Sequence, residues 1–275
     1  MEPEHLRTPS KFTLRIGKYT LIPFHFQFFF DDANLRGRLM ENRMRGMEEL
    51  SERFTPAMHP EKTPEELMAV KAEMREKFMV AAKKDVDEYL PILYNQALVM
   101  IITVFDVFLS DSLKTVTSKY PQLLKTMADE KDITILQIID LADYDAIFRK
   151  IQSRVLKRFD YKSITERIAI LKKLRVDIDA ALAFKFHNLE VQKKHPDALG
   201  VVQNSYEKRH AIVHREQHTF DTYEQLEMVS DCFTNLVMSL SFAIGFRFDI
   251  LTDWEKTFMV HPQRPKGGAN SHLSL

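Results

Sequence analysis

The apolar periodicity of residues 92–118 constrains the fold more than any other feature. Apolar side chains recur there at three- and four-residue steps, which places them on one face of an α-helix. The chain has only seven glycines in 275 residues, fewer than architectures of strands and turns usually need. We therefore predict an all-α fold with this helix at its core. The periodic positions are Leu98, Ile101, Ile102, Phe105, Phe108 and Leu109.

Proline and capping residues predict where several helices begin and end. A charged helix over residues 33–54 is broken by Pro56 and Pro60. The Thr63–Glu66 sequence is a capping box that starts the next helix, with Pro64 in its first turn. Pro91 then kinks or ends that helix at about Leu90, before the stretch at 92–118 begins.

The second half of the chain continues this helical pattern. Ser163 to Glu166 form another capping box, opening a helix that ends near Leu174. A last long helix, capped by Asp221 or Thr222, runs to about Phe248. We expect the core to be built from the helices at 92–118 and 222–248.

The N-terminal region differs from the rest. Phe12, Leu14 and Ile16 alternate with polar residues, and Gly17-Lys18 could turn the chain into residues 19–22, so a short β-hairpin is plausible. We divide the chain into an N-terminal extension at 1–60, a helical domain at 61–258 and a flexible tail at 259–275.

Composition indicates an intracellular, soluble protein. The formal net charge is zero, so nucleic acid could be attracted only by a local patch. Cys232 is the single cysteine, which excludes an intrachain disulfide and suits a reducing compartment. Glu2 and Glu4 make the start unlike a secretory signal, and the apolar runs at 97–105 and 236–246 are too short to span a bilayer. We expect a cytoplasmic location and no membrane contact.

The motif Arg209-His210-Ala211-Ile212-Val213-His214-Arg215 carries the main functional hypothesis. Arginine binds phosphate, and histidine moves protons near neutral pH, so together they can cleave RNA without a metal. The spacing by itself is a weak signal, because basic residues at helix ends are often only surface charge.

Each residue of the motif has an expected role in cleavage by the 2′-hydroxyl of RNA. Arg209 binds the scissile phosphate, and His214 is the general acid or base. His210 helps to orient the substrate or forms a hydrogen bond to it. The RNA backbone is contacted by Lys208, Arg215 and His218.

Residues five apart lie about 140° around a regular helix, so Arg209 and His214 do not share a face. Either the helix is distorted between them, or two copies of the motif meet in a dimer. We therefore predict a homodimer.

Other chemistry has little support in the sequence. His187, Glu190 and His195 lack the paired spacing of a metal site, and Cys232 is alone. Glycine-rich loops for dinucleotides or nucleotide phosphates are missing from the sequence, so no cofactor is expected.

The motif resembles the hallmark of the HEPN family of helical ribonuclease and nucleotide-binding domains, which is Arg, a polar residue, three further residues and His. Residues 97–111, with Asp106 before Phe-Leu-Ser-Asp, are similar to the first core helix of the RiboL-PSP-HEPN group. The resemblance covers about residues 85–250. His210 stands where asparagine is commoner in the family.

This resemblance implies an up-and-down helical bundle that dimerises, with two motifs lining one cleft. It implies metal-independent RNA cleavage by Arg209 and His214, with Asp106 as a supporting acid. It also implies a toxin or defence role, with an antitoxin or regulatory protein as partner. The alternative is a non-catalytic HEPN-like module for binding or dimerisation. A third interpretation is a structural protein in which the motif occurs by chance, and a buried His214 would favour it.

Overall fold

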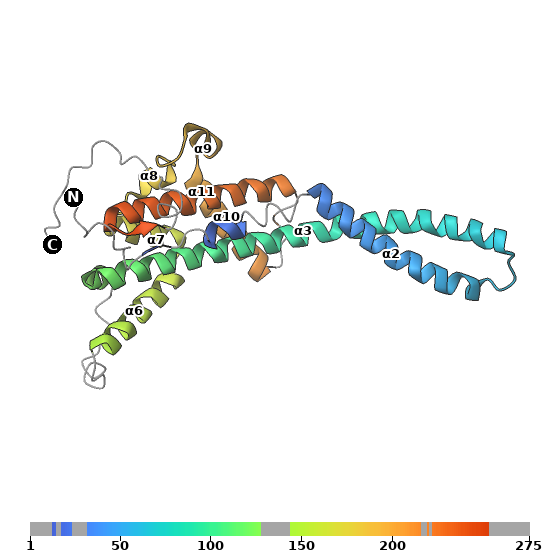
Figure 1. Ribbon diagram of the computed structural model, residues 1–275, viewed down its shortest axis with the longest axis horizontal. Helices are drawn as coiled ribbons and strands as arrows, with labels where there is room; N and C mark the ends of the chain where they lie inside the picture. Colours follow the sequence, from blue (N-terminus) through green and yellow to red (C-terminus); the bar gives the residue numbers. More distant parts are fainter. Residues whose placement is uncertain are drawn as a thin grey trace, which may run out of the picture. The chain divides into compact units, whose positions relative to one another are not determined.

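A computed structural model describes residues 13–14, 18–23, 32–127, 144–215, 219 and 222–252. These residues are mostly helical, with two very short strands, as Figure 1 shows. The predicted all-α character is confirmed.

Nine α-helices and one 3₁₀ helix carry labels within the described residues. They are α2 (Asp32–Met58), α3 (Pro64–Lys119), η2 (Pro121–Leu123), α4 (Leu124–Met127), α6 (Tyr144–Tyr161), α7 (Ile164–Lys173), α8 (Ile178–Leu182), α9 (Leu189–Lys194), α10 (Ala198–Arg215) and α11 (Tyr223–Phe248).

The chain forms two compact units. The first unit comprises residues 1–24, 100–207 and 229–275, and the second comprises residues 25–99 and 208–228. Each unit is therefore assembled from separate segments of the chain. The sequence division at residues 60 and 258 stays a prediction, and the tail at 259–275 lies outside the described residues.

The predicted helix starts are confirmed by their hydrogen bonds. The Thr63 amide donates to Glu66 Oε2 over 2.8 Å, and Ser163 forms the same reciprocal box with Glu166 at the start of α7. These boxes satisfy amide groups that would otherwise lack an acceptor at the first turn. Both boxes involve residues three apart, which is why the sequence alone predicts them.

The helix end predicted at Pro91 is wrong, while the kink offered there as the alternative stays a prediction. The end predicted at Pro56 and Pro60 falls between the two prolines, at Met58. Pro56 lies inside α2, and α3 continues through Pro91 as one helix of 56 residues. A proline removes one helical hydrogen bond and costs about 3 kcal/mol in a helix interior. The neighbouring Leu90 and Tyr94 are almost completely buried, and this packing offsets the cost.

The predicted core is confirmed in both of its helices. In the first unit, the rings of Phe105 on α3 and Phe233 on α11 meet edge to face, with centroids 5.0 Å apart. Phe108 also contacts Tyr19, at a centroid distance of 5.5 Å. All six periodic positions of the sequence are buried: Leu98, Ile101, Ile102, Phe105, Phe108 and Leu109.

The predicted N-terminal hairpin is wrong. Thr13–Leu14 (β1) pairs in parallel with Leu251–Thr252 (β2), and residues 18–23 are helical. Tertiary contacts decide this outcome: Tyr19 is buried and its hydroxyl donates to Asp111, while the Pro23 carbonyl accepts a hydrogen bond of 2.8 Å from Ser230. The period of two in the sequence reflects only local alternation.

The end of α11 positions β2. The Ile250 amide donates to the carbonyl of Gly245 over 3.0 Å, and Asp249 adopts a left-handed φ of 49°. A Cβ at Gly245 would come within 2.8 Å of the Ile250 carbonyl oxygen, so the close approach requires glycine. The Phe248 carbonyl accepts from Lys119 and Tyr120, which satisfies one of the last carbonyls of the helix.

Two helices, α3 and α11, are long and apolar enough to cross a membrane by length and composition. The apolar runs at 97–105 and 236–246 are shorter than these helices, because each run ends at a single charged residue. The most apolar windows of the two helices are 56% and 67% buried inside the protein, as in core helices of soluble proteins. The length and hydropathy of these two helices are therefore only weak evidence for a membrane span.

Candidate functional site

The Arg209–Arg215 motif occupies the last two turns of α10. His210 and His214 are both exposed and lie one helical turn apart, with ring centroids separated by 4.6 Å. Arg215 is exposed, while Lys208 and Arg209 are half-buried. His214 is therefore accessible to a ligand, and the burial that would have favoured a chance motif in a structural protein is not observed.

The helix is regular through the motif. Every residue from 209 to 214 is α-helical, so of the two alternatives the distorted helix has no support. A five-residue step then leaves these two side chains about 140° apart around the axis. One chain brings His214 together with His210 and does not bring it onto the same face as Arg209. His218 lies outside the described residues.

The exposed histidines sit at the carboxyl end of a helix dipole. His214 and Arg215 belong to the last turn of α10, where free carbonyl groups carry partial negative charge. The partial negative charge at this helix end favours nearby cationic side chains such as Arg215.

Asp106 is bound by partners that the sequence did not indicate. Its Oδ1 accepts hydrogen bonds from Arg167 of α7 and from the hydroxyl of Tyr206 on α10. Arg167 is 5% exposed and also donates to the backbone carbonyls of Asp160 and Lys162. This network attaches α10 to α3 and α7 within the first unit, so it supports a structural role for Asp106. The proposed role as a supporting acid stays a prediction.

The chain just after the motif is held by Asn95. The Oδ1 atom of this buried side chain accepts from the amide and the hydroxyl of Thr219, over 3.0 and 3.1 Å. Its Nδ2 atom donates to the carbonyl of Pro91. Asn95 thus fixes the position of Thr219, and no signal in the sequence distinguishes it from other polar residues of α3.

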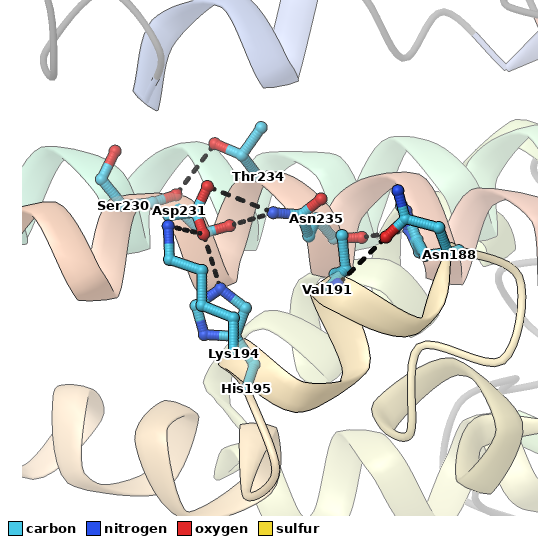
Figure 2. Close-up of polar contacts among 9 residues, drawn as sticks. Asn188, Val191, Lys194, His195, Ser230, Asp231, Thr234 and Asn235 are labelled. Atoms are coloured by element: carbon cyan, nitrogen blue, oxygen red, sulfur yellow. Dashed lines mark hydrogen bonds and ion pairs between the residues drawn. The ribbon is translucent and has the colours of Figure 1, made fainter.

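A second histidine cluster connects α9 to α11 in the first unit (Figure 2). The buried His195 ring forms a hydrogen bond of 2.6 Å with Asp231, and Lys194 forms an ion pair with the same carboxylate at 2.9 Å. The hydrogen bond from His195 lowers the pKa of Asp231 below its usual range. The His195 side chain is only 1% exposed, whereas Asp231 and Lys194 are 23% and 58% exposed. The imidazole itself is therefore closed to a substrate, and its hydrogen bond attaches the end of α9 to α11.

His187 is partly buried and Cys232 is fully buried in the first unit. His187 Nε2 lies 3.1 Å from the Asn235 carbonyl oxygen, and burial lowers the pKa of its ring. Burial also raises the pKa of the Cys232 thiol to about 12, which makes it a poor nucleophile.

Metal binding by the described residues has limited support. His210 and His214 have the i, i+4 spacing of a metal-binding pair, but structural zinc needs four ligands and catalytic zinc three. Within the part of the chain that the structure describes, no group of three or more His, Cys, Asp or Glu side chains could hold a metal ion.

No match to this chain was found among protein-family models, curated proteins or solved structures.

Proposed function

We propose that this protein is a metal-independent endoribonuclease of the HEPN type. The observation that carries the proposal is the exposed His210–His214 pair, with ring centroids 4.6 Å apart, in a helix end that also presents Arg215 and the half-buried Arg209. Two accessible imidazoles and a guanidinium are suited to phosphate chemistry near neutral pH.

The proposed reaction is attack of the RNA 2′-hydroxyl on the adjacent phosphate. One histidine removes the proton of this hydroxyl, and a second protonates the departing 5′-oxygen. The products are a 2′,3′-cyclic phosphate, which can open to a 3′-phosphate, and a 5′-hydroxyl. Arg209 binds the phosphate oxygens and stabilises the charge of the transition state.

The proposed enzyme acts as a homodimer. Because α10 is regular, Arg209 and His214 of one chain point in directions about 140° apart. Two copies of the motif facing each other can place an arginine of one chain beside a histidine of the other. The resemblance to HEPN domains favours the same arrangement and an antitoxin or regulatory partner, and the composition favours a cytoplasmic location.

The test is cleavage of RNA by the purified protein in EDTA. We expect His214→Ala to lower the rate about 10²- to 10⁴-fold, as loss of a general acid or base does, and Arg209→Ala to be comparably severe. Single-stranded DNA should resist cleavage because it lacks the 2′-hydroxyl. Mass spectrometry of the products should find the cyclic phosphate.

Matched controls separate chemistry from folding. Lys83→Ala removes an exposed cation from the middle of α3 and should leave the rate unchanged. Circular dichroism should show that each variant keeps its helix content, since His214 is exposed. Cleavage that survives both motif substitutions, stops in EDTA, or cuts DNA equally well contradicts the mechanism. RNA binding without any cleavage supports the alternative of a non-catalytic binding module.

A further inference from the structure

The segment from residue 144 to residue 175 is strongly basic in a protein with no net charge. It contains ten Lys and Arg against three Asp and Glu, a formal charge of +7. Helix α6 alone holds five of these basic residues and two acids. The first unit therefore carries a concentrated positive region far along the chain from the Arg209 motif.

Helix α6 separates its apolar and basic residues onto different faces. Val155 and Phe159 are 2% and 1% exposed, and Gln152 is anchored by hydrogen bonds to Thr117 and Ser118. The opposite face presents Lys150 and Lys157, both exposed and seven residues apart, which is two turns along one side of a helix.

Tyr161 continues the same exposed face at the end of α6. It follows Lys157 by four residues and is 81% exposed, the largest exposure of any large hydrophobic side chain in the described residues. A single exposed aromatic ring is common on protein surfaces, so its meaning depends on its neighbours. Here it stands in line with two lysines.

The two lysines have no ion-pair partner among the described carboxylates, whereas nearby cations do. Lys162 pairs with Glu166 at 3.7 Å, and Arg167 is buried against Asp106. Asp160, the one acid near the end of α6, accepts a hydrogen bond from Ser110. The charge of Lys150 and Lys157 is therefore directed to solvent.

We propose that the exposed face of α6, defined by Lys150, Lys157 and Tyr161, binds single-stranded nucleic acid. The lysines contact backbone phosphates, and Tyr161 stacks on an unpaired base. These contacts read neither sequence nor sugar, so the face holds a strand without selecting a site. That the biological ligand is RNA rests on the proposed function; the binding face itself does not.

An anionic membrane is the other polyanion that a basic helix could meet. A helix that lies on a bilayer inserts its apolar face into the acyl region. The apolar face of α6 is occupied by the core of the first unit, through Val155 and Phe159. Only the basic face is available, and this favours nucleic acid.

The test is fluorescence anisotropy of a labelled oligouridylate of about 20 nucleotides with the full-length protein. His214→Ala is the background in every sample, so that the probe is not cleaved. Lys150→Gln/Lys157→Gln should weaken binding and lower the slope of log K against log salt by about 1.4, since each lost contact to a single strand contributes about 0.7.

The matched control is Lys83→Gln/Lys84→Gln, which removes the same charge from two exposed positions of α3. We expect its affinity and salt slope to stay close to those of the background protein. Tyr161→Ala should weaken binding about fivefold or more with an unchanged salt slope, because stacking releases no counterions.

Three results overturn this inference. The first is an equal loss of affinity in the two lysine double variants, and the second is no binding of the oligouridylate. The third is binding to phosphatidylserine vesicles that depends on α6 while the oligouridylate does not bind. The outcome is independent of catalysis. A chain that binds through α6 and never cleaves RNA keeps the inference and loses the proposed function. A chain that cleaves RNA, and whose affinity for the oligouridylate does not depend on Lys150 and Lys157, does the reverse.

Discussion

The hairpin of α2 with the first half of α3 and the surroundings of α11 are both helical, yet they are held together by different forces. Between residues 35 and 81, the buried side chains are only Ser51 and Thr55, whose hydroxyl groups lie 3.2 Å apart. Along α11, the buried positions are mostly apolar and include Phe233 and Leu236.

Ion pairs connect the two helices of the hairpin, within the second unit. Arg75 bonds to Glu48 over 3.0 Å and Arg43 bonds to Asp85 over 2.6 Å, all at least partly exposed. Such pairs contribute about 0–1 kcal/mol each, whereas burying one large apolar side chain contributes about 1.5–3 kcal/mol. Helical structure therefore says little about local stability, and the burial of apolar area says much more.

The largest expected effect separates two phenylalanines. Phe233→Ala should lower the free energy of unfolding by about 3–5 kcal/mol, because this ring is 1% exposed and its loss leaves a cavity. Phe54→Ala on α2 removes a ring that is 51% exposed and should change the free energy by less than about 0.5 kcal/mol. Urea unfolding measures both, and equal losses would remove the contrast between the two regions.

A smaller effect is expected where α9 is attached to α11. Asp231→Asn should lower the free energy of unfolding by about 1.5–3 kcal/mol at neutral pH, because His195 and Lys194 lose a charged partner. The folded-state pKa of Asp231 lies below that of the unfolded chain, about 3.9.

That stabilisation is complete above the unfolded pKa and disappears as pH falls through the lower folded one. The difference in the free energy of unfolding between the native protein and the variant should thus stay about constant from pH 5 to 7. It should shrink in stronger acid. Urea unfolding at a series of pH values checks it. A difference that grows toward acid would show that the carboxylate does not act through its charge.

The smallest effect is expected in the hairpin. Arg43→Gln removes one exposed ion pair and should lower the free energy of unfolding by about 0.2–1 kcal/mol in low salt. The loss should become smaller in about 1 M NaCl, where the Debye length is about 3 Å. Thermal unfolding at both salt concentrations measures it, and a loss of several kcal/mol would mean that ion pairs carry more of the hairpin than their exposure implies.

Features set by near neighbours in the sequence could be predicted, and features set by distant partners could not. The capping boxes at Thr63 and Ser163 depend on residues three positions away, and the buried face of α3 depends on helical period alone. The continuation of α3 through Pro91 depends instead on the burial of Leu90 and Tyr94, which no local rule contains.

The candidate site shows the same limit. The accessibility of the His210–His214 pair agrees with its place near the end of a helix, and the i, i+4 spacing predicts that the rings meet. The partners of Asp106 come from α7 and α10, 61 and 100 residues further along the chain. The basic face of α6 was present in the composition of residues 144–175 but is concealed by a net charge of zero over the whole chain.

The parallel pairing of β1 with β2 has a consequence for biosynthesis. Thr13 bonds in register with Leu251, so the first strand leaves the ribosome long before its partner is made. At translation rates of roughly 5–20 residues per second, the wait is on the order of 10–50 s. During this interval Thr13 and Leu14 have no strand to pair with, so β1 can form only after α11 has been synthesised.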